Sequence, residues 1–377
     1  GRKPRTKEPH QLLRELDALH ALGWRGEVFL VDDNFIGNKR NVRLLLHELQ
    51  HWQRRHGHPF RFSTEASLDL AAEADLIEAM VHSGFQRVFL GIETPDGDSL
   101  QLAGKHQNLR HPLVQAVETI RGGGLQVMAG FILGFDGEAP GAGERITAFV
   151  EESAIPLAMV GVLQALPHTA LWNRLAAEGR LLAEGSDGQG ADRGVQTHLL
   201  NFRPSRPMAL IAREFLACFE ALYEPAAFRG RALRSCLQQG TALAAAPSGR
   251  RRAGGWPAGM LRGLAVILWR QGLRRPGRLG FWRDLLALLR RRPGMLPDYL
   301  WLLLIEEHML AYRQTVREQV IAQLASPLLQ EELVPSAGVP AAPADVAGPV
   351  PPASSADGKT ARAATEISAA SPALDAA

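Results

Sequence analysis

Arg87-Val-Phe-Leu-Gly-Ile-Glu-Thr-Pro95 is an apolar run that ends abruptly in a glycine, a carboxylate and a proline. Its centre is β-branched, aromatic and uncharged, which is typical of a strand buried on both faces of a parallel sheet. Glu93 then stands at the carboxyl end of that strand, where α/β folds place their ligands. A carboxylate there can accept two hydrogen bonds from a vicinal diol such as a ribose. The structural alternative is a solvated acid or a loop cap.

Three other predicted strands end in a similar way. They are Glu27–Asp33, which ends in Asp32-Asp33-Asn34; Phe60–Ser67, which carries Glu65; and Gln126–Phe135, which contains Gly130 and Gly134. Because the carboxyl ends of parallel strands meet at one edge, we expect these residues to share one rim, and we take that rim as the candidate active site. The acids have an alternative as turn caps, and the glycines as a bulge at a barrel corner.

Strand and helix periodicities alternate five times over residues 1–182, with short connections. This alternation predicts an α/β fold with a parallel sheet and right-handed crossovers. Five strands are too few for a closed eight-stranded barrel, so a partial barrel or an open sheet is expected.

The rest of the chain changes character. Residues 183–207 are polar and glycine-rich and are predicted to form a linker, and residues 208–330 show helical periodicity only. The helices expected there are Met208–Tyr223, Gly259–Gln271, Phe281–Arg291 and Leu296–Leu324. Residues 331–377 are rich in Ala, Pro, Ser and Gly and bury too little apolar surface to offset chain entropy, so a disordered tail is predicted.

Charge is distributed unevenly along the chain. The net charge is +3, but residues 250–292 hold twelve arginines and one acid, Asp284. Leucines and tryptophans alternate with these arginines, a pattern typical of helices on an anionic membrane surface. An ordinary helical domain with a cationic solvated face is the equal alternative. We expect no nucleic-acid partner.

Cysteine content and hydropathy exclude further classes of protein. Cys218 and Cys236 are the only cysteines and lack metal-site spacing, which excludes a disulfide framework and a cysteine-ligated cluster held by this chain alone. No apolar run approaches the roughly 20 residues of a spanning helix. We therefore expect a cytoplasmic protein, peripheral on the inner face of the membrane.

His47-Glu48-Leu49-Gln50-His51 matches the H-E-x-x-H pattern of zinc peptidases. On a helical wheel the apolar residues around it fall on one face, and both histidines fall on the opposite, solvent face. A catalytic pair would face a cleft, so we expect no metal there.

Four motifs, in order, resemble those of the cobalamin-dependent radical S-adenosylmethionine enzymes, most closely the branch that includes the hopanoid methylases. They are Asp32-Asp33-Asn34-Phe35-Ile36-Gly37-Asn38, Gly91-Ile-Glu93-Thr-Pro95, Gly130-Phe-Ile-Leu-Gly134-Phe-Asp and Leu163-Gln-Ala-Leu-Pro167-His-Thr169. The resemblance runs from Gly1 to about Arg317 and implies a partial (β/α)6 TIM-like barrel over residues 1–182. An all-α domain, residues 208–330, and the tail follow.

In that family a C-x3-C-x2-C motif after the first strand holds a [4Fe–4S] cluster, and a cobalamin-binding domain precedes the barrel. The start of this chain resembles the stretch just after the cysteine motif. The resemblance therefore implies that the first strand, the cluster ligands and the cobalamin domain lie outside this chain. By itself, the chain is expected to be inactive.

The resemblance also assigns roles to the rim. Glu93 would bind the ribose hydroxyls of S-adenosylmethionine. The backbone at Gly130, Ile132 and Gly134 would lie against the adenine. The methionine end would lie beside Asp32, Asp33 and Asn34, and Glu65 would face the lumen of the barrel. The implied activity is methylation of an unactivated carbon in a lipid-like, hopanoid or triterpenoid, substrate, with an electron donor for the cluster. A zinc peptidase using His47, Glu48 and His51 and a non-catalytic membrane-associated protein remain as alternatives.

Overall fold

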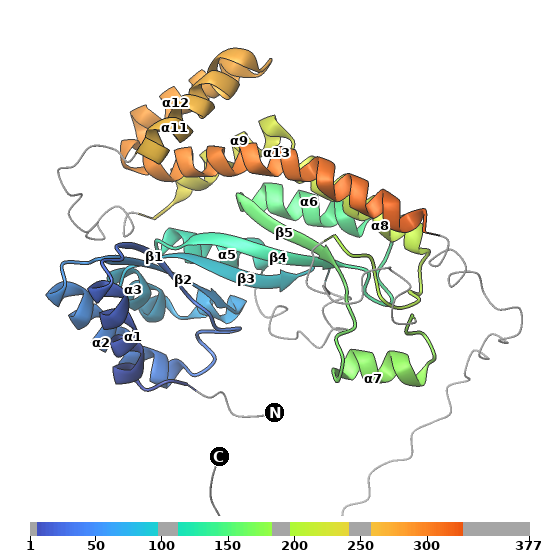
Figure 1. Ribbon diagram of the computed structural model, residues 1–377, viewed down its shortest axis with the longest axis horizontal. Helices are drawn as coiled ribbons and strands as arrows, with labels where there is room; N and C mark the ends of the chain where they lie inside the picture. The colour runs from blue at the N-terminus through green and yellow to red at the C-terminus, as the bar shows by residue number, and fades with distance from the viewer. Residues whose placement is uncertain (1–5, 97–111, 183–196, 241–257, 327–377) are drawn as a thin grey trace, which may run out of the picture. The chain divides into compact units, whose positions relative to one another are not determined.

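The protein is described by a computed structural model that covers residues 6–96, 112–182, 197–240 and 258–326. Five parallel strands follow one another in the order of the sequence: β1 (Gly26–Leu30), β2 (Phe60–Ala66), β3 (Phe85–Glu93), β4 (Gln126–Leu133) and β5 (Leu157–Val162). This sequential order is that of a barrel sheet, whereas doubly wound open sheets reverse it. The strands curl into a half-barrel (Figure 1), so the predicted partial barrel is confirmed.

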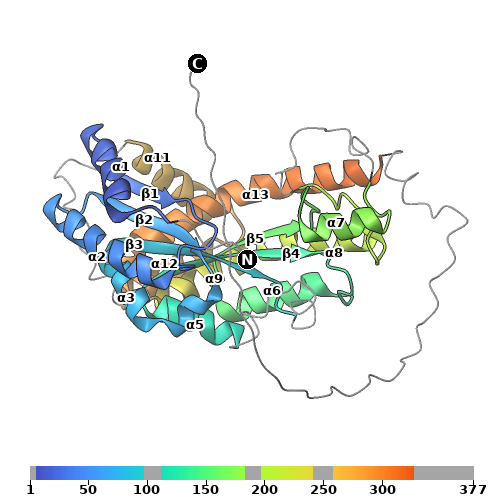
Figure 2. The ribbon, with the colours of Figure 1, turned by 90° about the horizontal axis from the view of Figure 1, so that it is seen from below.

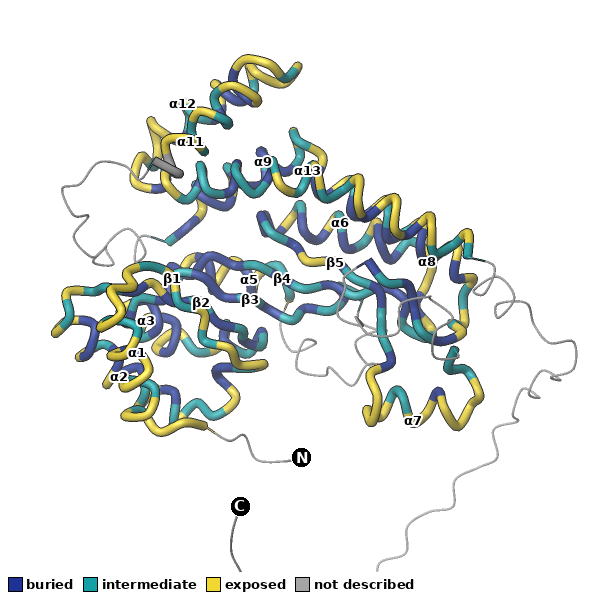
Figure 3. The backbone as a smooth tube through the Cα atoms, viewed as in Figure 1, coloured by how far each residue is buried: buried dark blue, intermediate teal, exposed yellow. Residues whose placement is uncertain are grey.

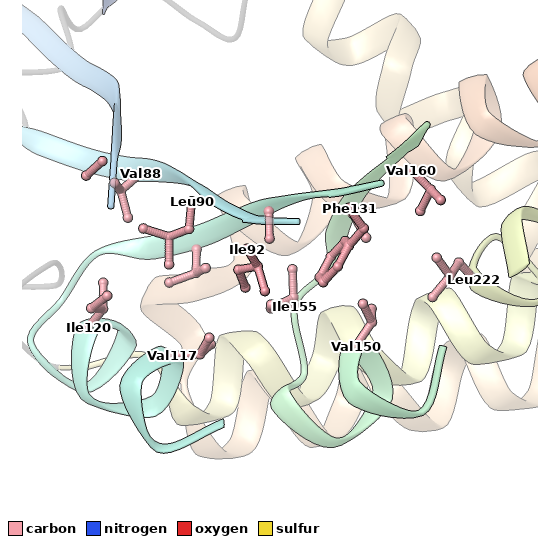
Figure 4. Packing of buried hydrophobic residues seen from close by; sticks show 14 of the residues in the cluster. Val88, Leu90, Ile92, Val117, Ile120, Phe131, Val150, Ile155, Val160 and Leu222 are labelled. Atoms are coloured by element: carbon pink, nitrogen blue, oxygen red, sulfur yellow. The ribbon is translucent and has the colours of Figure 1, made fainter. Parts of the chain in front are cut away.

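The helix before the first strand and the helices between the strands lie on the convex side of the sheet. They are α1 (Pro9–Ala21), α2 (Lys39–Arg55), η1 (Leu68–Ala72), α3 (Ala74–His82), α5 (Leu113–Gly122) and α6 (Ala142–Ser153), and α7 (Ala170–Ala177) follows β5. In Figure 4, Leu90 and Ile92 point toward α5, which presents Val117 and Ile120, while Phe131 lies above Val150 of α6. Alternate strand residues therefore form the core, as period-two strands require.

The concave face of the sheet is more open than predicted. Val88, Leu90 and Ile92 are fully buried, but Phe89 and Gly91, between them, are only half-buried. The prediction that this strand is buried on both faces is therefore wrong for its concave face. A half-barrel leaves its lumen side uncovered, and apolar runs do not reveal that. Figure 3 shows the same contrast along β3 and β4.

Element boundaries differ from the predicted ones by a few residues. Strand β1 ends at Leu30 because Asp32 accepts a hydrogen bond from the Asn34 N–H and turns the chain. Helix α3 begins at Ala74, after the short 3-10 helix η1. Helix α5 begins at Leu113, and residues 97–111 lie outside the described part.

The C-terminal part is helical, as predicted. It consists of α8 (Met208–Leu222), α9 (Pro225–Gln238), α11 (Ala258–Ile267), the π-helical turn η3 (Leu268–Arg274), α12 (Arg278–Arg291), η4 (Pro293–Met295) and α13 (Leu296–Leu324). Helix α8 packs on α6 and on β5, where the Tyr223 hydroxyl donates to the Ala158 carbonyl at 2.7 Å. A Cβ on Gly143 of α6 would lie 2.6 Å from the Glu214 carbonyl oxygen of α8, so this close approach requires glycine.

Helix α9 was not predicted. Its residues 229 and 231 are arginines that face inward, and Gly230 lies between them, so the apolar periodicity is weak. Arg231 is fully buried and donates to the carbonyl oxygens of Ile155, at 2.9 Å, and Leu222, at 2.6 Å. A buried arginine looks like a surface residue in the sequence, and only its distant partners make α9 part of the core.

Helix α13 runs along α8 and α9 (Figure 2). At its start the ring of Trp301 lies 4.1 Å beneath the guanidinium of Arg87, near the amino end of β3. Near its end Gln323 accepts from the Leu199 N–H at 2.9 Å. No helix in the described part of the chain is long and apolar enough to cross a membrane. The domain boundaries stay predictions, and most of the expected linker (183–196) and the whole tail lie outside the described residues.

Candidate active site

The loop after β1 is fastened to the end of β2. The Asn34 side-chain carbonyl accepts the Ser67 N–H at 3.1 Å, and the Phe35 N–H donates to the Glu65 carbonyl at 2.9 Å. Asp32 is engaged in its turn with Asn34. Asp32 therefore stabilises the turn, and Asn34 links the loop to the end of β2. Turn formation was the alternative that the sequence left open for these residues. Because Asp33 lies between them, these hydrogen bonds also hold its backbone in place.

Three carboxylates gather at this end of the sheet. Glu65 lies half-buried on the concave face, and its pKa is raised by burial and by the negative charges of Asp33 and Asp32. Asp33 and Asp32 therefore act electrostatically on Glu65, as expected of residues that share one rim. A cluster of this sign attracts a cationic group. Within the described ranges no group of three or more His, Cys, Asp or Glu side chains could hold a metal ion.

Glu93 has an unusual backbone. Its φ is +68°, in the left-handed region that non-glycine residues rarely adopt, and the β3–β4 register shifts between Gly91 and Glu93. The Thr94 N–H turns back to the Ile92 carbonyl at 2.9 Å. This conformation costs on the order of 1–3 kcal/mol, and such strain concentrates at functional sites.

The side chain of Glu93 folds back over Gly91. A Cβ built on Gly91 would lie 3.1 Å from Glu93 Oε1, tighter than ordinary contacts. The glycine therefore leaves the space in which the carboxylate is held. Gly91 lies opposite Gly130 in the β3–β4 register, so the sheet carries no side chains at two adjacent positions beside Glu93.

The glycines of β4 are tightly surrounded by the chain itself. A Cβ on Gly130 would lie 2.9 Å from the Phe89 ring, and one on Gly134 would lie 3.0 Å from Leu200. Gly134 also has a φ of +95°, and Ile132 is half-buried on the concave face. Phe89 and Leu200, which the sequence did not single out, therefore belong to the rim.

A buried ionic cluster supports the end of β4. Arg206 donates to Glu138 Oε2 at 2.6 Å and to Glu214 Oε1 at 2.9 Å, while the Gly134 and Gly141 N–H groups donate to the same two carboxylates. Burial raises the pKa of Glu138. For Glu214 burial acts in the same direction, but hydrogen bonds from Arg206 and Gly141 outweigh it and lower the pKa.

A second carboxylate of this loop, Asp136, is also paired with arginines. Asp136 accepts from Arg180 at 2.7 Å and from Arg174 at 2.9 Å. Sequence reasoning missed both clusters. The run Gly134-Phe-Asp-Gly-Glu138 marks the loop, but nothing local indicates that Arg206 would reach it.

The histidines of the H-E-x-x-H motif lie on the outer face of α2, as predicted. The His47 side chain is 66% exposed, and its Nε2 lies 3.3 Å from Nε2 of His51. Val42, Leu46, Leu49 and Trp52 form the buried face of the same helix.

We predict that the double change His47→Ala and His51→Ala leaves zinc content unchanged and alters the free energy of unfolding by less than about 0.5 kcal/mol. Both side chains point to solvent, so their removal creates no cavity. Metal analysis and urea unfolding of the purified chain test this. Stoichiometric zinc that is lost on the double change would contradict it.

The two cysteines are unsuited to an iron–sulfur cluster. Cys218 of α8 and Cys236 of α9 are both buried. Burial raises the pKa of the Cys218 thiol to about 11 and that of Cys236 to about 12, so both are neutral, whereas cluster ligands are thiolates. The cysteines of this chain do not fit a [4Fe–4S] cluster.

Comparison with known proteins identifies two regions. Residues 1–149 match the radical SAM superfamily, and residues 169–322 match a domain of unknown function, DUF4070. The chain is 48% identical to an "uncharacterized methyltransferase" of Synechocystis sp. over 332 residues, which are 88% of this chain and 60% of that protein. It is 35% identical to the hopanoid C-2 methylase of Rhodopseudomonas palustris over 340 residues, 89% of this chain and 62% of that protein.

Among solved structures, the radical S-adenosylmethionine methyltransferase TsrM from Kitasatospora setae, with cobalamin and a [4Fe–4S] cluster bound, matches with a TM-score of 0.39 and 18% identity. The match covers 46% of this chain and 34% of TsrM. The chain spans about 60% of the length of the first two relatives. The sequence motifs, the family match over residues 1–149 and these two relatives show that the chain contains a radical S-adenosylmethionine domain.

Proposed function

We propose that the rim formed by β1 to β4 binds S-adenosylmethionine, and that the whole protein is a methyltransferase. The observation that carries the first part is Glu93. Its carboxylate is held over Gly91 by a strained backbone, at the edge of the sheet that also carries Glu65, Asp32 and Asp33. The relatives named as methyltransferases support the second part.

The parts of the nucleotide are assigned by their chemistry. The Glu93 carboxylate would accept hydrogen bonds from the two ribose hydroxyls. The ring of Phe89, which lies against Gly130, and the half-buried side chain of Ile132 would offer apolar contacts to adenine. The segment that ends at Gly134 would border the base.

The methionine end is assigned to the acidic cluster. Asp32, Asp33 and Glu65 would attract its positively charged groups, with Asn34 fixing the loop that carries the two aspartates. Such a cluster favours the cationic ligand over its neutral breakdown products, because the attraction depends on the ligand's charge.

A radical S-adenosylmethionine domain implies S-adenosylmethionine and a [4Fe–4S] cluster as cofactors. Cobalamin is proposed as a further cofactor from the sequence resemblance. Because the cysteines here do not fit the cluster, the residues of this chain are assigned to S-adenosylmethionine alone. Their task is to bind and orient it and to keep water from the reacting carbon.

For the substrate we propose a lipid-like molecule of the hopanoid or triterpenoid class. The relative with a named substrate class is a hopanoid C-2 methylase. The concave face here also exposes apolar side chains, with Phe29 49% and Met159 56% accessible. We further propose an electron donor and an anionic membrane surface as partners.

We predict that Glu93→Gln weakens S-adenosylmethionine binding by about 1–3 kcal/mol, the usual loss for a charged hydrogen-bond acceptor. Equilibrium dialysis with the full-length, cluster-loaded protein measures it. Glu48→Gln on the exposed face of α2 is the control and should bind normally. An unchanged affinity in the Glu93 variant would place the ribose elsewhere and remove the basis of the proposed site.

A further inference from the structure

Helix α12 carries two separate apolar stripes. Phe281 and Leu288 are fully buried against the helical part and form the first stripe. The second consists of exposed residues: Leu279 at 80%, Trp282 at 44%, Leu286 at 46% and Leu289 at 41%. At about 100° per residue these four span an arc of about 80°, well away from the buried stripe. Packing of α12 against the core accounts for the buried stripe only, so the exposed stripe needs another explanation.

The preceding π-helical turn η3 continues this exposed stripe. Trp269 and Leu273, four residues apart, are 60% and 58% exposed. The Trp282 indole N–H donates to the Gly272 carbonyl at 2.8 Å, and a Cβ on Gly272 would lie 3.1 Å from that ring. The two segments therefore pack against each other, and both carry exposed apolar side chains.

Arginines border this apolar surface. On the α12 wheel Arg278 and Arg290 lie on either side of the exposed stripe, and Arg274 is exposed on η3. Within the described residues these three arginines form no ion pair. The one acid within residues 258–292, Asp284, is buried and paired with Arg229 at 3.1 Å. The neighbouring acids Glu306 and Glu307 of α13 are also largely buried and are paired with Arg275. The surface therefore presents positive charge only. We name it the basic-apolar surface: Trp269, Leu273, Arg274, Arg278, Leu279, Trp282, Leu286, Leu289 and Arg290.

We propose that the basic-apolar surface docks on an anionic lipid bilayer, with the leucines and Trp269 inserted among the acyl chains and the arginines bound to phosphate headgroups. Guanidinium groups bind phosphate in a planar, two-pronged fashion. Leucines gain nothing from a nucleic-acid backbone but gain from an acyl phase. The inference rests on the membrane partner proposed above and locates its contact surface. It uses no residue of the nucleotide site, so its failure would leave that site unaffected.

Vesicle flotation of the purified chain tests the proposal. The probes are vesicles of phosphatidylcholine alone and of equal parts phosphatidylcholine and phosphatidylglycerol. The chain should float with the anionic vesicles only. Part of the binding should survive a salt concentration near 1 M, where screening acts within about 3 Å, because inserted apolar groups are insensitive to salt.

Two sets of substitutions separate the contributions. Leu279→Gln, Leu286→Gln and Leu289→Gln should each weaken binding about tenfold and together abolish the salt-resistant part. Arg278→Gln and Arg290→Gln should each weaken it about fivefold at low salt and scarcely at high salt. The matched control is Leu22→Gln with Leu44→Gln, at positions that are 83% and 57% exposed elsewhere; it should float like the parent chain.

Several outcomes would overturn the proposal. No flotation with anionic vesicles at low salt, complete loss at high salt, or equal loss in the Leu22 and Leu44 control would each do so. Self-association that the leucine changes abolish, without flotation, would assign the surface to a second copy of the chain. Retention on nucleic acid that the leucine changes leave intact, again without flotation, would assign it to a polyphosphate partner.

Discussion

Replacing Arg206 with methionine is expected to lower the free energy of unfolding by about 3–5 kcal/mol. Arg206 lies between two carboxylates, and the side chain of Glu138 has no exposed surface. Without the guanidinium, Glu138 is left as a buried acid whose remaining donor is the Gly134 N–H, and Glu214 repels it. The segment that carries Arg206 would lose its ion pair with Glu138, and with it its attachment to the loop after β4.

Urea unfolding at pH 8 measures this effect. Arg213→Met is the matched control, because Arg213 is an exposed arginine next to Glu214, and it should change stability by less than about 0.5 kcal/mol. Adding Glu138→Gln to the Arg206 variant should recover part of the loss, since the buried charge is then gone. A loss below about 1 kcal/mol would show that the cluster does not hold this end of the sheet.

A second large effect is expected from Glu306 of α13 as the pH changes. Its side chain is 1% exposed, and burial raises its pKa to about 7 although Arg275 lies at 3.2 Å and Arg229 is also near. Glu307 and Glu224 act in the same direction as burial. The folded protein therefore holds this proton more tightly than the unfolded chain does.

The sign of the pH dependence follows from that difference. The contribution of Glu306 to stability is fully present below about pH 4.5, the unfolded value, and is lost as the pH rises through about 7. Relative to Glu306→Gln, which stays neutral, the parent chain should lose about 3 kcal/mol between pH 4.5 and 8. Urea midpoints of both proteins at several pH values give the difference, and effects of other groups cancel.

Glu318→Gln provides the control on the same helix. Glu318 is exposed, so its substitution should give no such pH-dependent difference. If the Glu306 variant and the parent chain keep a constant stability difference from pH 4.5 to 8, Glu306 is ionised throughout. The ion pair with Arg275 would then outweigh burial.

Much of the site was already visible in local sequence patterns. The strand before Glu93, the glycines of β4 and the acids after β1 were predicted from runs of apolar residues that end in polar ones. This works because a buried strand and its end are properties of a few consecutive residues. The solvent face of His47 and His51 followed in the same way from the helical period of α2.

Other features depend on residues far apart in the chain. The strained backbone of Glu93 coincides with the register shift between β3 and β4, a feature of strand pairing across the sheet. The partners of Arg206 and the role of α9 were missed because a buried arginine has no local signature. The second apolar stripe of α12 was also hidden, since a sequence shows which residues are apolar but not which of them the fold covers.

Local patterns of side-chain polarity were therefore enough to predict the strands, most of the helices and the rim at which the strands end, because each spans only a few consecutive residues. The residues alone left a partial barrel and an open sheet as alternatives, and the family resemblance favoured the barrel. The sequential order of the strands and the open concave face became visible only in the folded chain. The same holds for which charges are buried in pairs and which leucines stay exposed. Those outcomes depend on long-range packing, where the free energy of a side chain is set by neighbours that the local sequence does not name.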